Sequence, residues 1–69
     1  MNGRPKPEAY RLALEHYGAR AENTFFADDS LENVEGAQAL GITGHHLTYV
    51  DGVPQTDALL AAIERFAAR

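Results

Sequence analysis

The 69-residue sequence contains no cysteine, so neither a disulfide framework nor a thiolate metal site can form. It has no apolar run long enough to cross a bilayer, and its N-terminus lacks the apolar segment of a signal peptide. Low-complexity segments and blocks of like charge are also missing. We therefore expect a soluble, cytoplasmic protein that does not associate with membranes.

Positive charge is scarce as well, because 6 Lys and Arg residues stand against 10 Asp and Glu residues. The resulting net charge of -4 argues against nucleic acid and against an anionic membrane surface as partners. A hydrophobic content of 45% is ordinary for a globular chain, so disorder is not expected. At this length the chain forms at most one small domain, near the limit at which a single core suffices.

The apolar residues recur at helical or strand spacing, and Gly and Pro separate the segments. A polar, Pro-containing lead-in at 1–7 comes first. The expected elements are a helix at 8–17, a strand at 24–27, a helix at 31–40, a strand within 42–50 and a last helix that runs through 68 with Thr56 as its N-cap. We expect the Tyr and Phe side chains to belong to the core, with Leu59, Ile63 and Phe66 as the buried stripe of the last helix.

The order α-β-α-β-α predicts an α/β fold with parallel strands, in a partial Rossmann-like three-layer α/β/α arrangement. Two strands are too few for a parallel sheet that is buried on both faces. The sequence therefore predicts that residues 1–69 are a piece of a larger α/β domain. An open sheet edge would also allow the chain to associate with itself.

The first expected strand ends at two adjacent carboxylates and a serine, Asp28, Asp29 and Ser30. Ligands of open α/β sheets bind in the crevice outside the carboxyl ends of the strands. Neighbouring carboxylates repel each other, and a bound Mg²⁺ removes that repulsion because it takes one or two protein carboxylates as ligands. A simpler interpretation is that Asp29 or Ser30 caps the next helix while Asp28 is only solvated.

Two segments together resemble the C-terminal part of haloacid dehalogenase-like (HAD superfamily) hydrolases. The first is a basic residue followed by Pro-x-Pro-Glu and an aromatic, which residues 4–10 contain as RPKPEAY. The second follows about twenty residues later, as an apolar strand, an acidic pair and a helix that ends at Gly. Here it reads FFADDSLENVEGA at 25–37 and LGI at 40–42.

The resemblance implies a role for each matching residue. A basic residue contacts the substrate phosphate and the nucleophilic aspartate, and Arg4 takes that place by register, with Lys6 as the second candidate. Asp29 matches the direct Mg²⁺ ligand of the family. Asp28 matches its neighbour, which acts through a metal-bound water or a hydrogen bond.

Ser30 and Asn33 lie in the same turn and are the candidates for orienting it and for contacting substrate. The sequence departs from the family in lacking the residues of the other half of the site, which include the nucleophile. Family members form an aspartyl-phosphate in an Asp-x-Asp motif, and this sequence contains no such motif. The Ser/Thr motif and any cap domain that would select the substrate are missing too. The implied function is the C-terminal part of a Mg²⁺-dependent phosphatase for a small phosphorylated metabolite, inactive alone because covalent catalysis needs its nucleophile.

Two other classes of protein remain as alternatives. A receiver-like phosphoacceptor module also begins with a strand that ends in paired acids, but it needs a later phosphoacceptor aspartate and a further lysine. Asp51 comes too early for that role, and no lysine follows Lys6. The other alternative is a non-catalytic fragment that associates through its sheet edge.

The adjacent His45 and His46 should point to opposite faces of a strand, so they are not expected to share a metal.

Overall fold

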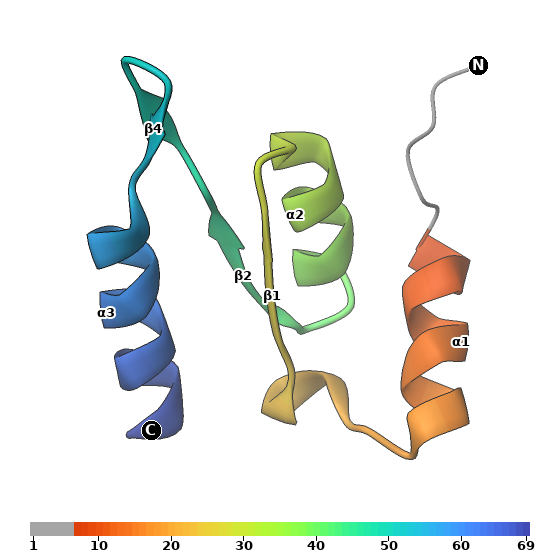
Figure 1. Ribbon diagram of the computed structural model, residues 1–69. Helices are drawn as coiled ribbons and strands as arrows, with labels where there is room; N and C mark the ends of the chain where they lie inside the picture. Colours follow the sequence, from red (N-terminus) through yellow and green to blue (C-terminus); the bar gives the residue numbers. More distant parts are fainter. Residues whose placement is uncertain (1–6) are drawn as a thin grey trace, which may run out of the picture.

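The computed structural model describes residues 7–69, so the predicted lead-in with Arg4 and Lys6 lies outside the described residues. Its elements in order are α1 (Pro7–Tyr17), the 3₁₀ turn η1 (Ala21–Asn23), β1 (Phe25–Asp28), α2 (Leu31–Gln38), β2 (Thr43–His46), β3 (Tyr49–Val50), β4 (Val53–Pro54) and α3 (Thr56–Ala67). The chain is therefore a mixed α/β structure with a small parallel sheet (Figure 1). The predicted order of three helices and two parallel strands is confirmed, with a short hairpin added before the last helix.

Strands β1 and β2 pair in parallel, in a register that runs from Phe25 opposite Thr43 to Asp28 opposite His46. Because side chains alternate along a strand, neighbouring residues of β1 face opposite sides of the sheet. The ring of Phe25 lies 5.5 Å from that of Phe66 in α3, whereas the ring of Phe26 lies 5.5 Å from that of Tyr10 in α1. Helices thus cover both faces, α3 on one side and α2 with α1 on the other (Figure 1). The described residues contain only two parallel strands, so the predicted Rossmann-like arrangement is confirmed only as a small parallel sheet with helices beside it.

The second predicted strand, within 42–50, is wrong beyond His46. Tyr49 and Val50 leave the parallel pair and form β3, which pairs antiparallel with Val53 and Pro54 of β4. The turn between them has positive φ angles at both central residues, 52° at Asp51 and 77° at Gly52. Two-residue hairpins of type I′ need this conformation, and Asp-Gly is among their preferred sequences. The hairpin signal therefore outweighed the continuation of β2.

The fully buried core is small and lies between α2 and the sheet. Among the described residues it consists of Val34, Ala37 and Ile42. Gly44 of β2 allows this packing, because a Cβ at that position would lie 2.8 Å from Cγ1 of Val34. Helix α2 can approach the strand closely only where the strand has no side chain.

The aromatic and apolar stripes predicted for the core are only partly buried. Tyr17 at the end of α1 is 80% exposed, and Ile63 in the predicted stripe of α3 is 41% exposed. Leu59 and Phe66 of the same stripe are half-buried. Tyr49 is also an exposed hairpin residue. The prediction of a buried core made of these residues is therefore wrong in extent, because the two-stranded sheet is too narrow to cover them.

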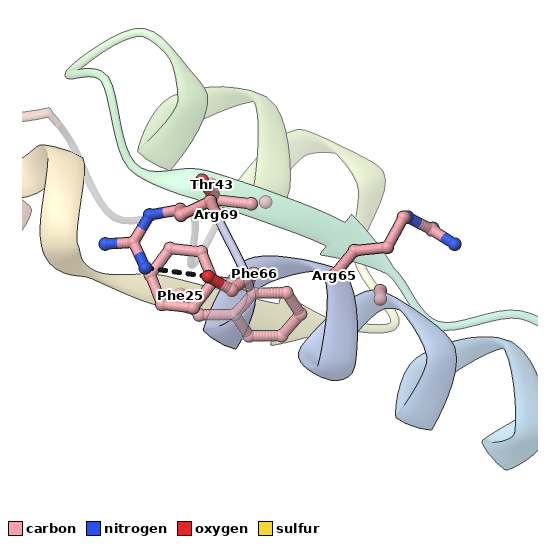
Figure 2. A pocket seen from close by; sticks show the side chains of 7 residues that line it. Phe25, Thr43, Arg65, Phe66 and Arg69 are labelled. Carbon is pink, nitrogen blue, oxygen red and sulfur yellow. Dashed lines mark hydrogen bonds between the residues drawn. The ribbon is translucent and has the colours of Figure 1, made fainter.

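A hollow of about 310 Å³ lies between α3 and the first residues of the two parallel strands (Figure 2). Phe25 and Phe66 form its apolar side, and Thr43 adds a hydroxyl. The polar groups around it do not converge on the rings: Arg65 points away from them in Figure 2, and the guanidinium of Arg69 is occupied by hydrogen bonds. The hollow therefore lacks the converging polar groups of a ligand site.

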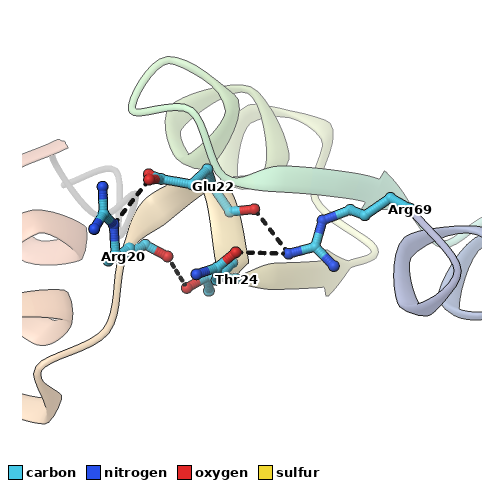
Figure 3. A network of polar contacts seen from close by, with 5 residues as sticks. Arg20, Glu22, Thr24 and Arg69 are labelled. Atoms are coloured by element: carbon cyan, nitrogen blue, oxygen red, sulfur yellow. Dashed lines mark hydrogen bonds and ion pairs between the residues drawn. The ribbon is translucent and has the colours of Figure 1, made fainter.

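Arg69 fastens the end of α3 to the turn that precedes β1. Its guanidinium donates to the carbonyl oxygen of Glu22 at 3.0 Å and to Oδ1 of Asn23 at 2.9 Å (Figure 3). It also donates to the carbonyl oxygen of Phe66 at 2.7 Å and lies 3.7 Å from the centre of the Phe66 ring. These exposed contacts are individually weak, but together they hold the C-terminal end of α3 beside the start of β1.

Candidate functional site

The two parallel strands end side by side at the acidic turn, by which we mean Asp28, Asp29 and Ser30. β1 ends at Asp28 and β2 ends at His46, its partner in the register. The backbone N–H of Leu47 donates to the carbonyl oxygen of Asp28 at 2.8 Å, which joins the two chain segments where they leave the sheet. The acidic pair thus lies at the carboxyl end of the sheet, the edge at which α/β folds bind their ligands.

The carboxylate of Asp28 is held inside the turn by two donors. Its Oδ2 accepts a hydrogen bond from Nδ2 of Asn33 at 2.9 Å, and its Oδ1 accepts from the backbone N–H of Ser30 at 3.4 Å. The Asn33 contact is the main reason that the pKa of Asp28 lies below its usual range, and the Ser30 N–H adds to this effect against partial desolvation. Asp28 is therefore an oriented anion, and the interpretation that it is only solvated is wrong.

Ser30 caps α2, as one of the two sequence interpretations predicted. Its Oγ accepts a hydrogen bond from the backbone N–H of Asn33 at 3.4 Å. Asn33 therefore takes part in the turn twice, through its backbone N–H to Ser30 and through its side-chain amide to Asp28. Both residues orient the turn, and contact with substrate stays a prediction for them.

Asp29 differs from Asp28 in its surroundings, since its side chain is exposed at the surface of the turn. Its backbone carbonyl oxygen lies 3.1 Å from Nε2 of His46, within hydrogen-bonding distance. No group of three His, Cys, Asp or Glu residues able to hold a metal occurs among residues 7–69. The pair can still suit Mg²⁺, which accepts one or two protein carboxylates and fills its remaining positions with water and phosphate oxygens.

Tyr10 links the first helix to the acidic turn. Its hydroxyl donates to the backbone carbonyl oxygen of Asn33 at 3.0 Å, and its ring packs edge-on against Phe26. Burial and the nearby negative charge of Asp28 both raise the pKa of the Tyr10 hydroxyl. The sequence predicts only a core position for this tyrosine, and its hydrogen bond to the acidic turn is an additional role. Its place in the Pro-x-Pro-Glu-aromatic motif, which the resemblance pairs with the acidic pair, was the signal that could have linked it to the acids.

Two other sequence predictions concern residues close to the strands. The register places His45 opposite Ala27 and His46 opposite Asp28, so the two histidines face opposite sides of the sheet as predicted. Asp51 lies in the turn of the β3–β4 hairpin rather than at the end of a strand in the parallel sheet. This position does not support the receiver-like alternative, in which a phosphoacceptor aspartate ends a parallel strand next to the acidic pair.

The hydrogen bond from Asn33 gives a prediction about pH. Because the pKa of Asp28 is lowered in the folded chain, its ionised form stabilises the fold above the unfolded-chain pKa, and this contribution is lost as pH falls through the folded value. In Asn33→Ala, we expect the carboxyl of Asp28 to titrate at a higher pH. The ¹³C shifts of the carboxyl groups measure this, with Asn23→Ala as a control outside the turn. Identical titration of Asp28 in wild type and Asn33→Ala would contradict the assignment of Asn33 as the main cause.

None of the helices in the described part of the chain has the length and apolar character needed to cross a membrane.

Comparisons with known proteins give one match of interest. No protein-family model matches the sequence, and no solved structure matches it. The sesquiterpene phosphatase astK of Aspergillus oryzae (strain ATCC 42149 / RIB 40) is 47% identical over 50 residues, which are 70% of this chain and 26% of that protein. The matched region thus spans about a quarter of the length of the relative. The chain that carries the acidic turn is therefore similar to one part of a phosphatase.

Proposed function

We propose that this chain is part of a HAD-like, Mg²⁺-dependent phosphatase that acts on a small phosphate ester. The observation that carries the proposal is the acidic turn at the carboxyl ends of β1 and β2, with an oriented Asp28 beside an exposed Asp29. The similarity to a phosphatase over 70% of the chain and the two motifs that resemble HAD hydrolases support the same interpretation.

The two carboxylates have different tasks in this proposal. Asp29 is the direct ligand of Mg²⁺, because its carboxylate is exposed. Asp28 is hydrogen-bonded to Asn33 and Ser30, so it holds the turn, and its carboxylate would accept a hydrogen bond from water on the bound cation. Bound Mg²⁺ would supply positive charge to the phosphate oxygens of the substrate. Arg4, with Lys6 as second candidate, would add a cationic donor for the same oxygens.

The nucleophile of the reaction has to come from outside the residues named so far. No Asp-x-Asp occurs in the sequence, and the two acids of the turn are engaged as ligand and orienting group. The chain thus supplies the electrostatic half of a phosphatase site, and an Asp-x-Asp segment elsewhere in the parent protein supplies the attacking carboxylate. We place the protein in the cytoplasm, with a phosphorylated metabolite as partner and neither nucleic acid nor membrane.

Phosphorylated sesquiterpenes belong among the substrates to be assayed, because the 47% identical relative is named as a sesquiterpene phosphatase. Generic phosphate esters belong there too, since the substrate-selecting segments of the family do not occur in this sequence.

Titration with Mg²⁺ tests the metal assignment. We expect the backbone amides of 28–31 to shift first in ¹H–¹⁵N spectra, with a Kd of about 1 mM or weaker, which is about -4 kcal/mol. Binding is weak because two carboxylates leave most of the octahedron to water. Asp29→Asn should abolish the shifts, whereas the matched change Asp51→Asn in the hairpin should leave them intact. Shifts that spare the acidic turn would show that the metal site has been misplaced.

A further inference from the structure

We propose that His46 is a positioning residue for the acidic turn: it holds the Asp29 peptide group from the neighbouring strand and thereby sets the direction of the Asp29 carboxylate. This inference rests on the proposed metal-binding function of Asp29 and deepens it. Nothing in the pattern of the sequence assigned a role to His46, which was expected only to face away from His45.

The parallel register brings His46 to this position. It is the partner of Asp28 at the last position of the β1–β2 pair, so its side chain lies on the same face as that of Asp28. From there its Nε2 reaches the backbone carbonyl oxygen of Asp29 at 3.1 Å, across 17 positions of sequence. A carbonyl oxygen can only accept, so the contact is a hydrogen bond when Nε2 carries the ring proton.

Hydrogen bonds therefore fix the backbone carbonyl groups of both acidic residues of the turn. The carbonyl of Asp28 accepts from the N–H of Leu47, and the carbonyl of Asp29 accepts from His46. Ser30 continues into α2 as its N-cap. With the peptide groups on either side fixed, rotation of the Asp29 backbone is restricted, and its carboxylate projects in a limited set of directions. A ligand on a fixed turn loses less conformational freedom when it binds a cation than a ligand on a free loop does.

His45 provides a matched control within the same strand. Its ring stacks on Phe25 at 6.5 Å between centroids, on the face that α3 covers. Replacing it removes the same amount of side chain from β2 without touching the acidic turn. A purely structural role of the strand histidines would therefore give His45→Ala and His46→Ala the same consequences.

The experiment compares wild type, His46→Ala, His46→Gln and His45→Ala in the 69-residue chain, first without metal and then with Mg²⁺ added. The chain is kept below the concentration at which sedimentation velocity detects association, or is bound to a segment that pairs with the open edge of β1. In His46→Ala, the amides of Asp29 and Ser30 should shift without metal, and the Kd for Mg²⁺ should rise about fivefold, the size expected from one lost hydrogen bond. His46→Gln should stay within about twofold of wild type, because its amide N–H can take the place of Nε2–H. His45→Ala should match wild type at the turn.

The measurements without metal and with Mg²⁺ distinguish a wrong role for His46 from a wrong metal site. If the amide shifts of Asp29 and Ser30 are the same in metal-free His46→Ala as in wild type, His46 does not fix the conformation of the turn. Equal loss of Mg²⁺ affinity in His45→Ala and His46→Ala, or no rescue by Gln, would overturn its positioning role. A wild-type titration that leaves the acidic turn unmoved would overturn the metal assignment, and with it the effect of His46 on affinity.

Discussion

The 69-residue chain by itself should not turn over p-nitrophenyl phosphate at an enzymatic rate, even with saturating Mg²⁺. Hydrolases typically reach about 1 per second or faster. Removing the nucleophile from a serine protease costs on the order of 10⁶-fold in rate, and we expect a deficit of that order here. The expectation follows from the groups that the acidic turn provides, none of which is placed to attack phosphorus.

The groups of the site explain why the deficit is large but not absolute. Asp28 is oriented by Asn33 and Ser30, and Asp29 is the proposed metal ligand, so both carboxylates are engaged in holding the turn and the cation rather than in attack on phosphorus. Mg²⁺ and a basic residue such as Arg4 can still stabilise charge on a phosphate ester, which allows slow, metal-assisted hydrolysis by water. The acidic turn is therefore expected to supply electrostatic stabilisation but no covalent step.

Complementation tests the proposal that a separate segment supplies the nucleophile. The assay is run with the chain alone, with Asp29→Ala, and with each after refolding together with a segment that carries an Asp-x-Asp strand. Activity that appears only in the mixture, and is lost with Asp29→Ala, would support a site shared between the two segments. Turnover near 1 per second by the chain alone, lost in Asp29→Ala, would show that these residues contain a complete active site.

The acidic turn was predictable because consecutive residues determine it. An apolar run that stops at two acids and a serine predicts strand, turn and capped helix, and the structure contains β1, the turn and α2 in that order. The predicted end of this helix at Leu40 is wrong by two residues, because α2 ends at Gln38, and Gly41 with its φ of 91° lies in the turn that follows. Gly36 lets the ring of Tyr10 approach α2, since a Cβ at position 36 would lie 3.3 Å from a carbon of that ring.

The contacts that complete the site depend on register and could not be read from local sequence. Tyr10 is 23 positions from Asn33, and His46 is 17 positions from Asp29. Whether these pairs meet is decided by how α1 packs on α2 and by which residue of β2 lies opposite Asp28. The hairpin was missed for a related reason: Tyr49 and Val50 continue the apolar pattern of β2, and only the Asp51-Gly52 turn diverts them.

Instability of the isolated chain is the second large effect that we expect. The fully buried residues among those described are only Val34, Ala37 and Ile42, while several large apolar side chains remain exposed. The radius of gyration is 12.8 Å, compared with about 11 Å for a compact domain of this length. So small a core gives little free energy to offset the conformational entropy of the chain.

The open edge of β1 adds a specific route to association. The carbonyl oxygens of Thr24 and Asp28 accept from the chain segment of β2, so the ladder of β1 on that side is complete. In a parallel ladder alternate residues bond to opposite sides, which directs the backbone groups of Phe25 and Ala27 to the other edge. No strand pairs there among residues 7–69. Such an edge can bind another strand, from a further polypeptide segment or from a second copy of the chain.

We therefore expect the chain at about 100 μM to form oligomers or a partly molten state rather than a compact monomer. Sedimentation velocity over a hundredfold range of concentration measures the first outcome, and binding of a hydrophobic dye together with near-UV circular dichroism measures the second. A segment that supplies the missing strand should suppress both, because it covers the β1 edge and the exposed apolar side chains at once. A monomer at every concentration with a single sharp, dye-free unfolding transition would show that Val34, Ala37, Ile42 and their half-buried neighbours form a self-sufficient core. In that case the acidic turn belongs to an independent small domain, and the requirement for a larger sheet is wrong.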